Sequence, residues 1–340
     1  MPAEAAAGAP ACVDVALATY NGATFLAAFL DTVAAQDHPH LRIVASDDHS
    51  ADGTAALLAA FAPGHTIVVQ NKGPRGFRSN FANAIAHCDA PYIALADQDD
   101  AWARDKISAL LSRMTALEAR HGADTPLLVC SDLAVVDRDL QPLRPSFFAS
   151  WDPPVASLSF ADLTLGNRIP GCSMLLNRAL VDHAMPLPTS IHLHDWWLVL
   201  VASALGIVDV VERPLVLYRQ HGGNQLGDVH QRVSGWDRIL PKLKDPLTHW
   251  SKRAELFRAS TPDFMATLKS FDARFGGQLD RADAAVLRAG VLPGLVRKLW
   301  RYRSAHSPFG RIFKIMALFF LDEAERRADR AARHAAPRAR

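Results

Sequence analysis

The chain has 340 residues, a length that suits two domains or one large domain with an appendage. Hydrophobic residues make up 49% and charged residues 21%, which excludes a collagen-like, coiled-coil or largely disordered chain. The net charge of +2 is divided unevenly: residues 291–340 hold 12 basic and 4 acidic residues, and the first 290 hold 25 and 31. We expect the acidic body and the basic end to have different roles.

The four cysteines lie far apart, and none belongs to a CxxC or CxxH pair. This spacing argues against a zinc site or a disulfide framework and favours reduced thiols. No charged and apolar leader precedes Val13, and the longest apolar run, 196–208, is too short to span a bilayer. The sequence therefore predicts a cytoplasmic protein, and it leaves open a peripheral contact with the inner face of the cell membrane.

Short apolar runs alternate with helical patterns over the first hundred residues. The predicted strands are Val13–Thr19, Leu41–Ala45, Thr66–Val69 and Pro91–Ala96, and the predicted helices are Thr24–Ala35, Ala55–Phe61 and Phe77–His87. Such alternation indicates an α/β fold with a parallel, doubly wound sheet, in which ligands bind at the carboxyl ends of the strands. Polar residues gather at those ends, at 20–21, 47–48, 71–72 and 97–100.

The pattern continues beyond residue 100 and changes near residue 230. We expect a helix from Ala103 to about Arg120, a strand at Leu127–Ser131, a loop at 141–156, and further elements at Ile169–Leu176, Asp195–Leu205 and Leu215–Tyr218. From about residue 232 the segments are helical and broken by prolines. The boundary is therefore placed near 230, between a domain of residues 1–230 and a helical region of residues 231–340.

The turn after the first predicted strand excludes a dinucleotide-binding site. A Rossmann fingerprint needs GxGxxG there, and residues 20–24 (YNGAT) carry a single glycine. No GxxxxGK[ST] motif occurs in the chain. The phosphates of a nucleotide at this edge would need another source of positive charge.

Two acidic segments follow predicted strands. Asp47 and Asp48 end the second strand, where a carboxylate can accept the N3–H of uracil or thymine; helix capping by Ser50 or Asp52 is the alternative, and it leaves the paired carboxylates unexplained. Residues 97–100 (DQDD) place three carboxylates after a buried strand, where they repel one another unless a cation joins them. An acidic turn before a helix is the alternative, but the position beside 47–48 favours Mg²⁺ or Mn²⁺.

Two later segments carry further candidates. Asp195 opens a predicted helix, either as a cap or as a functional carboxylate, and we expect one of Trp196 and Trp197 to leave the core and line a sugar pocket. Residues 218–227 combine Arg219 and His221 with three glycines, which suits a loop that closes over an anionic ligand. A lone histidine is more often structural.

Taken in this order, the segments resemble the family 2 glycosyltransferases with the GT-A fold, in their bacterial rhamnosyltransferase-like branch. The resemblance spans roughly residues 10–230, and it rests on several motifs in register. They are ATYNG at 18–22, SDDHSADGT at 46–54, ALADQDDAW at 94–102 with Lys106 following, PGCSMLLNR at 170–178, HDWWLVLVAS at 194–203 and LYRQHGGNQLG at 217–227. The implied fold is α/β, a mostly parallel GT-A sheet with flanking helices, followed by a helical C-terminal region.

The resemblance implies inverting transfer of a sugar from a nucleotide diphosphate to a saccharide hydroxyl, in surface polysaccharide synthesis. By position, Asp195 is the general base, and Asp99 and His221 are ligands of Mg²⁺ or Mn²⁺. Tyr20 would flank the pyrimidine, Asp48 would accept its N3–H, and Asp97 would hold ribose or sugar hydroxyls. The remaining donor-binding positions are Thr19, Asn21, Asp47, Lys72, Asn80, Gln98, Gly171, Cys172, Trp196 and Arg219. Gln98 departs from relatives that carry a further carboxylate there.

The resemblance also indicates partners. The donor would be dTDP-rhamnose, with a UDP-sugar as the alternative, and the acceptor a saccharide or lipid-linked saccharide. The end of the chain interleaves basic residues such as Arg297 and Lys314 with large apolar ones such as Phe319, so it is either an interfacial membrane helix or a helix packed on the catalytic domain. Nucleic acid is not expected as a partner. The competing function is a catalytically inactive subunit that binds a nucleotide sugar or glycan; the presence of Asp195 and Asp99 argues against it.

Overall fold

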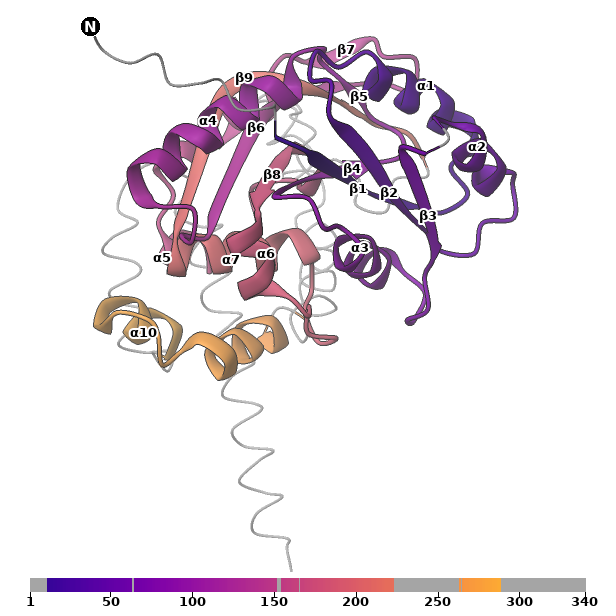
Figure 1. Ribbon diagram of the computed structural model, residues 1–340. Helices are drawn as coiled ribbons and strands as arrows, with labels where there is room; N and C mark the ends of the chain where they lie inside the picture. The colour runs from indigo at the N-terminus through magenta and orange to yellow at the C-terminus, as the bar shows by residue number, and fades with distance from the viewer. Residues whose placement is uncertain are drawn as a thin grey trace, which may run out of the picture.

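One mixed β-sheet forms the centre of the molecule (Figure 1). The structure is a computed structural model that describes residues 11–62, 64–151, 154–164, 166–222, 263 and 265–288. Within this part, eight strands follow one another in the order β3-β2-β1-β4-β8-β6-β9-β5, and β7 pairs with β6. The prediction of an α/β fold is confirmed.

The first half of the sheet is parallel. Its strands are β1 (Val13–Thr19), β2 (Leu41–Asp47), β3 (Thr66–Gln70) and β4 (Tyr92–Asp97), joined by α1 (Ala23–Ala34), α2 (Thr54–Ala60) and α3 (Phe77–Ala86). All seven elements lie within two residues of their predicted bounds. In register, Thr19 of β1 lies opposite Asp47 of β2, and Ala18 lies opposite Asp97 of β4. The predicted polar strand ends therefore meet at one edge of the sheet.

The second half of the sheet mixes both directions, unlike the all-parallel pattern that the first hundred residues indicated. Its strands are β5 (Ala101–Trp102), β6 (Leu127–Val136), β7 (Pro142–Arg144), β8 (Met174–Asn177) and β9 (Ile207–Arg219). β8 runs antiparallel to both β4 and β6, whereas β6 and β9 are parallel. β6 and β9 extend beyond their predicted lengths because they pair with each other from Leu127 to Val136, with two register shifts.

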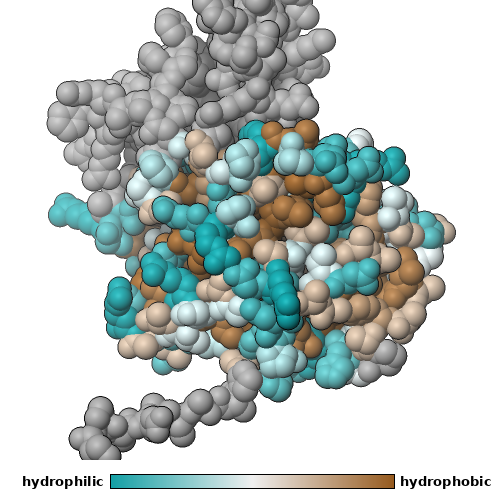
Figure 2. All heavy atoms as spheres, turned by 90° about the horizontal axis from the view of Figure 1, so that it is seen from above, coloured by the Kyte–Doolittle hydropathy of each residue, from teal (hydrophilic) through white to brown (hydrophobic). Residues whose placement is uncertain are grey.

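Helices cover both faces of the sheet (Figure 1). On one face lie α1, α2 and α4 (Lys106–His121); on the other lie α3, α6 (Arg178–Ala184) and α7 (His194–Leu205). Short helical segments complete the connections: η1 (Phe148–Ser150), η2 (Val155–Ser157), α5 (Phe160–Leu163) and η3 (Gly171–Ser173). Seen from above, hydrophilic and hydrophobic residues are interspersed on the surface, as expected for helices with one side in water (Figure 2).

Helix α7 is buried along most of its length, which corrects one prediction. Both Trp196 and Trp197 are at most 1% exposed, and their indole N–H groups donate to the carbonyl oxygens of Leu163 and Ala184. The helix lies between the sheet on one side and α5, α6 and residues 265–275 on the other, so both faces of the Trp pair meet the core. Neither tryptophan leaves the core to line a sugar pocket.

The described part of the C-terminal region packs on the first domain. Residues 265–275 are helical and are followed by α10 (Arg281–Arg288). Phe271 is fully buried, and its ring lies 5.7 Å from that of Trp197 and 5.5 Å from that of Phe160. The predicted boundary near 230 and the basic tail of residues 291–340 lie outside the described residues.

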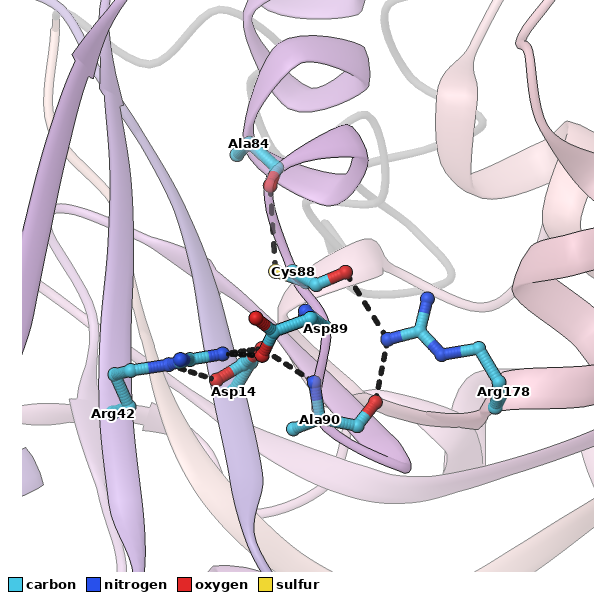
Figure 3. Close-up of polar contacts among 7 residues, drawn as sticks. All are labelled: Asp14, Arg42, Ala84, Cys88, Asp89, Ala90 and Arg178. Atoms are coloured by element: carbon cyan, nitrogen blue, oxygen red, sulfur yellow. Dashed lines mark hydrogen bonds and ion pairs between the residues drawn. The ribbon is translucent and has the colours of Figure 1, made fainter.

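At the edge of the sheet opposite the polar strand ends, an ion-pair network joins β1, β2 and the turn before β4 (Figure 3). Asp14 is fully buried; its carboxylate accepts two hydrogen bonds of 2.8 Å from the Arg42 guanidinium and two from the backbone N–H groups of Asp89 and Ala90. Arg178 of α6 donates to the carbonyl oxygen of Ala90 at 2.5 Å, so the same turn is also tied to the second half of the molecule.

We expect Asp14→Ala to lower the free energy of unfolding by about 2 kcal/mol, because it removes the buried partner of the Arg42 guanidinium and the acceptor of two backbone N–H groups. The exposure of Arg42, 26% for its side chain, keeps the loss below that of a fully buried pair. Urea denaturation measures this change in the free energy of unfolding. The purified variant should bind nucleotide with unchanged affinity, because β1 separates Asp14 from the polar edge; equal stability of the two proteins would contradict the network's role.

The four cysteines, Cys12, Cys88, Cys130 and Cys172, are free thiols, as predicted. No helix among the described residues is long and apolar enough to cross a membrane.

Candidate active site

The carboxyl ends of β1 and β2 are tied together by side chains. The Thr19 hydroxyl donates to Asp47 Oδ1 at 2.9 Å, and the same carboxylate accepts from the Ser50 N–H at 2.9 Å and the Ser50 hydroxyl at 2.5 Å. Thr19 is fully buried and Asp47 is 7% exposed. These two predicted donor-binding residues therefore shape the turn at this edge.

The turn between β1 and α1 donates its backbone N–H groups to protein side chains. The N–H groups of Asn21, Gly22 and Ala23 donate to Ser50 Oγ, Thr54 Oγ1 and Asp52 Oδ2, at 2.8–3.0 Å. In a dinucleotide site, the N–H groups of this turn would be available to a pyrophosphate. Here they are already used, which agrees with the exclusion of a dinucleotide-binding site. The side chain of Tyr20, next to this turn, is 44% exposed at the rim.

Asp48 lies beneath a loop that follows β3. Its carboxylate accepts from Asn71 Nδ2 and from the Gly76 N–H, both at 2.7 Å, and it is 5% exposed. Two bonds leave part of a carboxylate's acceptor capacity for a nucleobase N–H. Lys72 lies in the same loop and is exposed. Asn71 was predicted to lie at this edge without a binding role, and it holds this loop against Asp48.

Asn80 of α3 joins this edge from the other face of the sheet. Its side-chain N–H donates to the Thr19 carbonyl oxygen at 2.9 Å. The residue is 2% exposed, and its Oδ1 has no hydrogen-bond partner within the described part of the chain.

The acidic turn after β4 is held by Gln98. Its side-chain amide donates to the Tyr20 carbonyl oxygen and accepts from the Tyr20 N–H, both at 2.9 Å. A Cβ on Gly22 would lie 2.1 Å from Gln98 Oε1, so the glycine permits this contact. The departure from a carboxylate at position 98 thus has a local reason: an amide can bond both groups of Tyr20, and a carboxylate cannot.

Asp99 and His221 meet although they are 122 residues apart. His221 Nε2 lies 2.9 Å from Asp99 Oδ2, with the two side chains 16% and 17% exposed. The imidazole ring packs 4.6 Å from the ring of Phe25 in α1. Phe25 was not predicted as a site residue; its position on the first helix, after the YNG turn, is the sequence signal that could have indicated it.

Arg219 supports the acidic turn through its own contacts. Its Nε donates to the Asp99 carbonyl oxygen at 2.6 Å, and another guanidinium nitrogen donates to the Arg138 carbonyl oxygen. Arg219 is 4% exposed, and its guanidinium lies 4.8 Å from the centre of the Phe25 ring. These contacts engage the guanidinium that was predicted to bind the donor.

A buried cluster lies behind the acidic turn. Ligand atoms of Asp97, Asp100 and Cys172 lie within 4.8 Å of one another. The Lys106 ammonium is fully buried, donates to the Cys172 carbonyl oxygen at 2.7 Å and lies 3.4 Å from the centre of the Trp102 ring. Burial, followed by the negative charge of Asp99, raises the pKa of both Asp97 and Asp100, and burial lowers that of Lys106.

Two groups of side chains could therefore hold a metal ion, and they differ in fit. Burial and nearby carboxylates raise the pKa of the Cys172 thiol, and a thiol must lose its proton to ligate a metal. The neighbouring Lys106, whose pKa burial lowers, donates to the Cys172 carbonyl oxygen beside this group. Asp99 and His221 offer a carboxylate oxygen and an imidazole nitrogen at the partly open side of the turn. A carboxylate and an imidazole suit Mn²⁺ or Mg²⁺ better than a protonated thiol does.

Asp195 lies in the first turn of α7, next to this cluster. Its carboxylate accepts from its neighbour's N–H, that of Trp196, at 2.7 Å and from the Gly171 N–H at 3.2 Å. Burial raises its pKa to about 6, and these bonds, with one from the Asn167 side chain, oppose the shift. The charge of Asp195 in turn contributes to the raised pKa of Asp97, so the two carboxyl groups are electrostatic neighbours.

His194 is a second polar residue at the start of α7. Its ring stacks 3.9 Å from that of Phe81, and its Nε2 would lie 3.1 Å from a Cβ placed on Gly171. Burial lowers its pKa to about 3, so the imidazole is neutral. Neither ring nitrogen has a hydrogen-bond partner among the described residues. The sequence contained His194 within a motif but gave no reason to assign it a role, and Asn167 lies outside every motif.

Comparison with known proteins identifies the first part of the chain. The family model described as Glycosyl transferase family 2 matches residues 14–180. These residues form a family 2 glycosyl transferase domain. The resemblance read from the motifs is confirmed at the level of the family, and the residues of α7, β9 and 265–288 lie beyond the matched range.

The transferase domain also resembles individual proteins. A dTDP-rhamnosyl transferase of Shigella flexneri is 26% identical over 62% of this chain and 73% of its own length. A succinoglycan biosynthesis protein of Rhizobium meliloti is 30% identical over 39% of this chain and 36% of its own length. The chain also resembles the crystal structure of S. aureus TarS 1–349 in complex with UDP-GlcNAc. The two structures superpose over 93% of this chain and 92% of the TarS chain, with 14% identity and a TM-score of 0.52. The structural likeness supports the GT-A fold.

Proposed function

We propose that this transferase moves a sugar, with rhamnose favoured, from a nucleoside diphosphate to a hydroxyl of a saccharide acceptor, with inversion at the anomeric carbon. The observation that carries the proposal is the position of Asp195, a buried carboxyl group fixed by two backbone N–H groups and electrostatically coupled to the acidic turn. An acceptor hydroxyl between the two would meet a base on one side and the donor on the other.

The donor would lie along the carboxyl ends of β1, β2 and β4. Asp48 has acceptor capacity for the N3–H of a pyrimidine, and the exposed Tyr20 would flank the base. The similarity to a dTDP-rhamnosyl transferase supports dTDP-rhamnose as the first donor to test. A UDP-sugar presents the same N3–H and remains the alternative.

A divalent cation would neutralise the diphosphate. Asp99 and His221 would hold it, and when bound it would stabilise the charge that develops on the leaving group. Asp97 would hold ribose or sugar hydroxyls. Lys72, exposed on the loop after β3, would add a second positive charge. Arg219 would act on the same turn indirectly, through its bond to the Asp99 carbonyl oxygen.

Asp195 would remove the proton from the attacking hydroxyl. A carboxyl group with a pKa of about 6 is mostly ionised at pH 7, and its carboxylate is more basic than that of an exposed aspartate. The attacking oxygen displaces the nucleoside diphosphate in one step, so no covalent sugar–enzyme intermediate forms. The acceptor would be a saccharide or lipid-linked saccharide, in keeping with a relative in polysaccharide synthesis.

Nucleotide-sugar binding and turnover should be measured together. We expect dTDP-rhamnose with Mn²⁺ to raise the melting temperature more than a purine nucleotide sugar does, because bound ligand stabilises by RT ln(1 + [L]/Kd). Release of the sugar to water should follow at a measurable rate. Equal shifts with purine and pyrimidine donors would contradict base reading, and binding without sugar release or transfer would favour the inactive binding subunit.

A further inference from the structure

We propose that the helix of residues 265–275, which we name the clamp helix, positions the general base by holding both ends of segment 185–193. This segment connects α6 to α7 and leads directly into Asp195. The clamp helix lies beyond the family 2 domain, whose match ends at residue 180. The inference rests on the proposed role of Asp195.

The first end of the segment is held by Arg274. Its guanidinium donates four hydrogen bonds, of 2.5–3.1 Å, to four consecutive carbonyl oxygens at the end of α6. The acceptors are His183, Ala184, Met185 and Pro186. The last carbonyl groups of a helix have no partner within it and carry partial negative charge, so a forked cation satisfies them by geometry and by charge.

The second end is held by Thr267, two turns earlier on the clamp helix. Thr267 is fully buried, and its hydroxyl accepts from the His192 N–H at 2.7 Å, two residues before α7 begins. The Ser270 hydroxyl bonds that of Ser190 at 2.7 Å. From the catalytic domain, Arg78 of α3 donates to the carbonyl oxygen of Ile191 at 2.5 Å. The segment is thus bonded from two directions just before it enters α7.

Aromatic packing fixes the clamp helix to α7 itself. Phe271 and Phe275 lie 5.7 and 5.9 Å from the ring of Trp197, which follows Asp195 by two residues. Both phenylalanines are at most 3% exposed. Three kinds of contact, at the end of α6, at 190–192 and on Trp197, therefore surround the start of α7 on its outer side.

The base has few contacts that hold the start of α7 in place: besides the Asn167 side chain, its donors are two backbone N–H groups. Its two backbone donors are Trp196, on the same helical turn, and Gly171 at 3.2 Å. The neighbouring His194 forms no hydrogen bond with a described residue through its ring. A shift of segment 185–193 would therefore move Asp195 relative to the acidic turn, and a misplacement of about 1 Å can cost on the order of a hundredfold in rate.

Thr267→Val and Thr267→Ser form the primary test, with Arg274→Met and Arg274→Lys as a second pair. We expect Thr267→Val and Arg274→Met to lower sugar release from dTDP-rhamnose with Mn²⁺ by about tenfold or more, and to leave its Kd within about twofold. Thr267→Ser keeps the hydroxyl and should behave as wild type. Arg274→Lys keeps one cation at the end of α6 and should recover part of the rate.

Arg178→Met is the matched control. Arg178 also donates to backbone carbonyl oxygens, those of Cys88 and Ala90, but at the opposite edge of the sheet (Figure 3). It should lose stability and keep its rate per folded molecule. Hydrogen exchange gives a readout without catalysis: amides of residues 187–195 should exchange faster in Thr267→Val, and those of β1 should not.

The outcomes separate the clamp from the proposed function. Wild-type turnover and exchange in folded Thr267→Val and Arg274→Met would overturn the clamp. If donor affinity falls as much as the rate does, the helix supports overall stability instead of the base. The same conclusion follows if Thr267→Val does not fold. Asp195→Asn, measured in parallel, tests the base: if it keeps full activity, the proposed function of Asp195 fails, whereas the exchange result still decides whether the helix holds the segment.

Discussion

Asp195→Asn is expected to lower sugar transfer by roughly a hundredfold or more, the range that loss of a general base gives. The substitution keeps the size of the side chain and one acceptor oxygen for the Trp196 N–H, so the donor affinity should stay near that of wild type. The amide group cannot accept the proton of the attacking hydroxyl. Single-turnover rates and nucleotide-sugar affinity, measured on the same preparations, test both expectations.

The pH dependence of the transfer rate gives a second, independent test of Asp195. Because the pKa of Asp195 is about 6, the wild-type rate should fall as the pH drops through 6, and the residual rate of Asp195→Asn should lack this step. The folded-state pKa lies above the unfolded value of about 3.9, so the ionised carboxylate opposes folding above pH 6. The asparagine substitution therefore removes an electrostatic cost of folding above pH 6. This gain offsets the weaker hydrogen bond that the Gly171 N–H donates to the new side chain. We expect the melting temperature at pH 8 to stay within a few degrees of wild type.

Asp14→Asn provides the control for replacing a buried carboxylate with an amide. Asp14 lies near the start of β1 and Thr19 at its end, so roughly 16 Å separates this network from the active edge at the usual rise per residue. This variant should lose stability and keep its turnover. A fully active Asp195→Asn enzyme would mean that the base lies elsewhere and that Asp195 only fixes the start of α7.

The elements of the first hundred residues were predictable because local signals agree there. Buried positions in α1, Leu26, Phe29, Leu30 and Val33, repeat at helical spacing, and each strand is a short apolar run between turns. Parallel strands then bring their carboxyl ends to one edge by topology alone. The meeting of Thr19, Asp47 and Asp97 at that edge therefore followed from the sequence.

Contacts that depend on tertiary packing were not predictable. The pair Trp196–Trp197 was expected to divide between core and pocket, but α7 is covered on both sides, and one helical segment of that cover comes from residues 265–275. Likewise, Arg219 has the charge that a diphosphate needs, but its guanidinium bonds backbone carbonyl oxygens. Residue type indicated the chemistry that each side chain could perform, and packing decided which partner it has.

Asp99→Ala is expected to reduce Mn²⁺-dependent binding of dTDP or UDP by about a hundredfold or more, because a metal ion contributes several kcal/mol of charge stabilisation at such a site. The variant removes the carboxylate that faces His221 at 2.9 Å and leaves the backbone carbonyl oxygen that Arg219 bonds. The turn should therefore keep its fold. Calorimetric titration of nucleotide with and without Mn²⁺ measures the dependence.

Asp105→Ala is the matched control for the acidic turn. This carboxylate lies six residues further on, is 41% exposed and forms a surface ion pair with Arg213. Its loss should leave Mn²⁺-dependent binding unchanged, because a metal held by Asp99 and His221 would not involve it. If Asp99→Ala binds dTDP with the Mn²⁺ dependence of the wild type, the metal does not lie at Asp99. The buried group of Asp97, Asp100 and Cys172 would then be the site to test, with Lys106→Met to remove the amino group beside it.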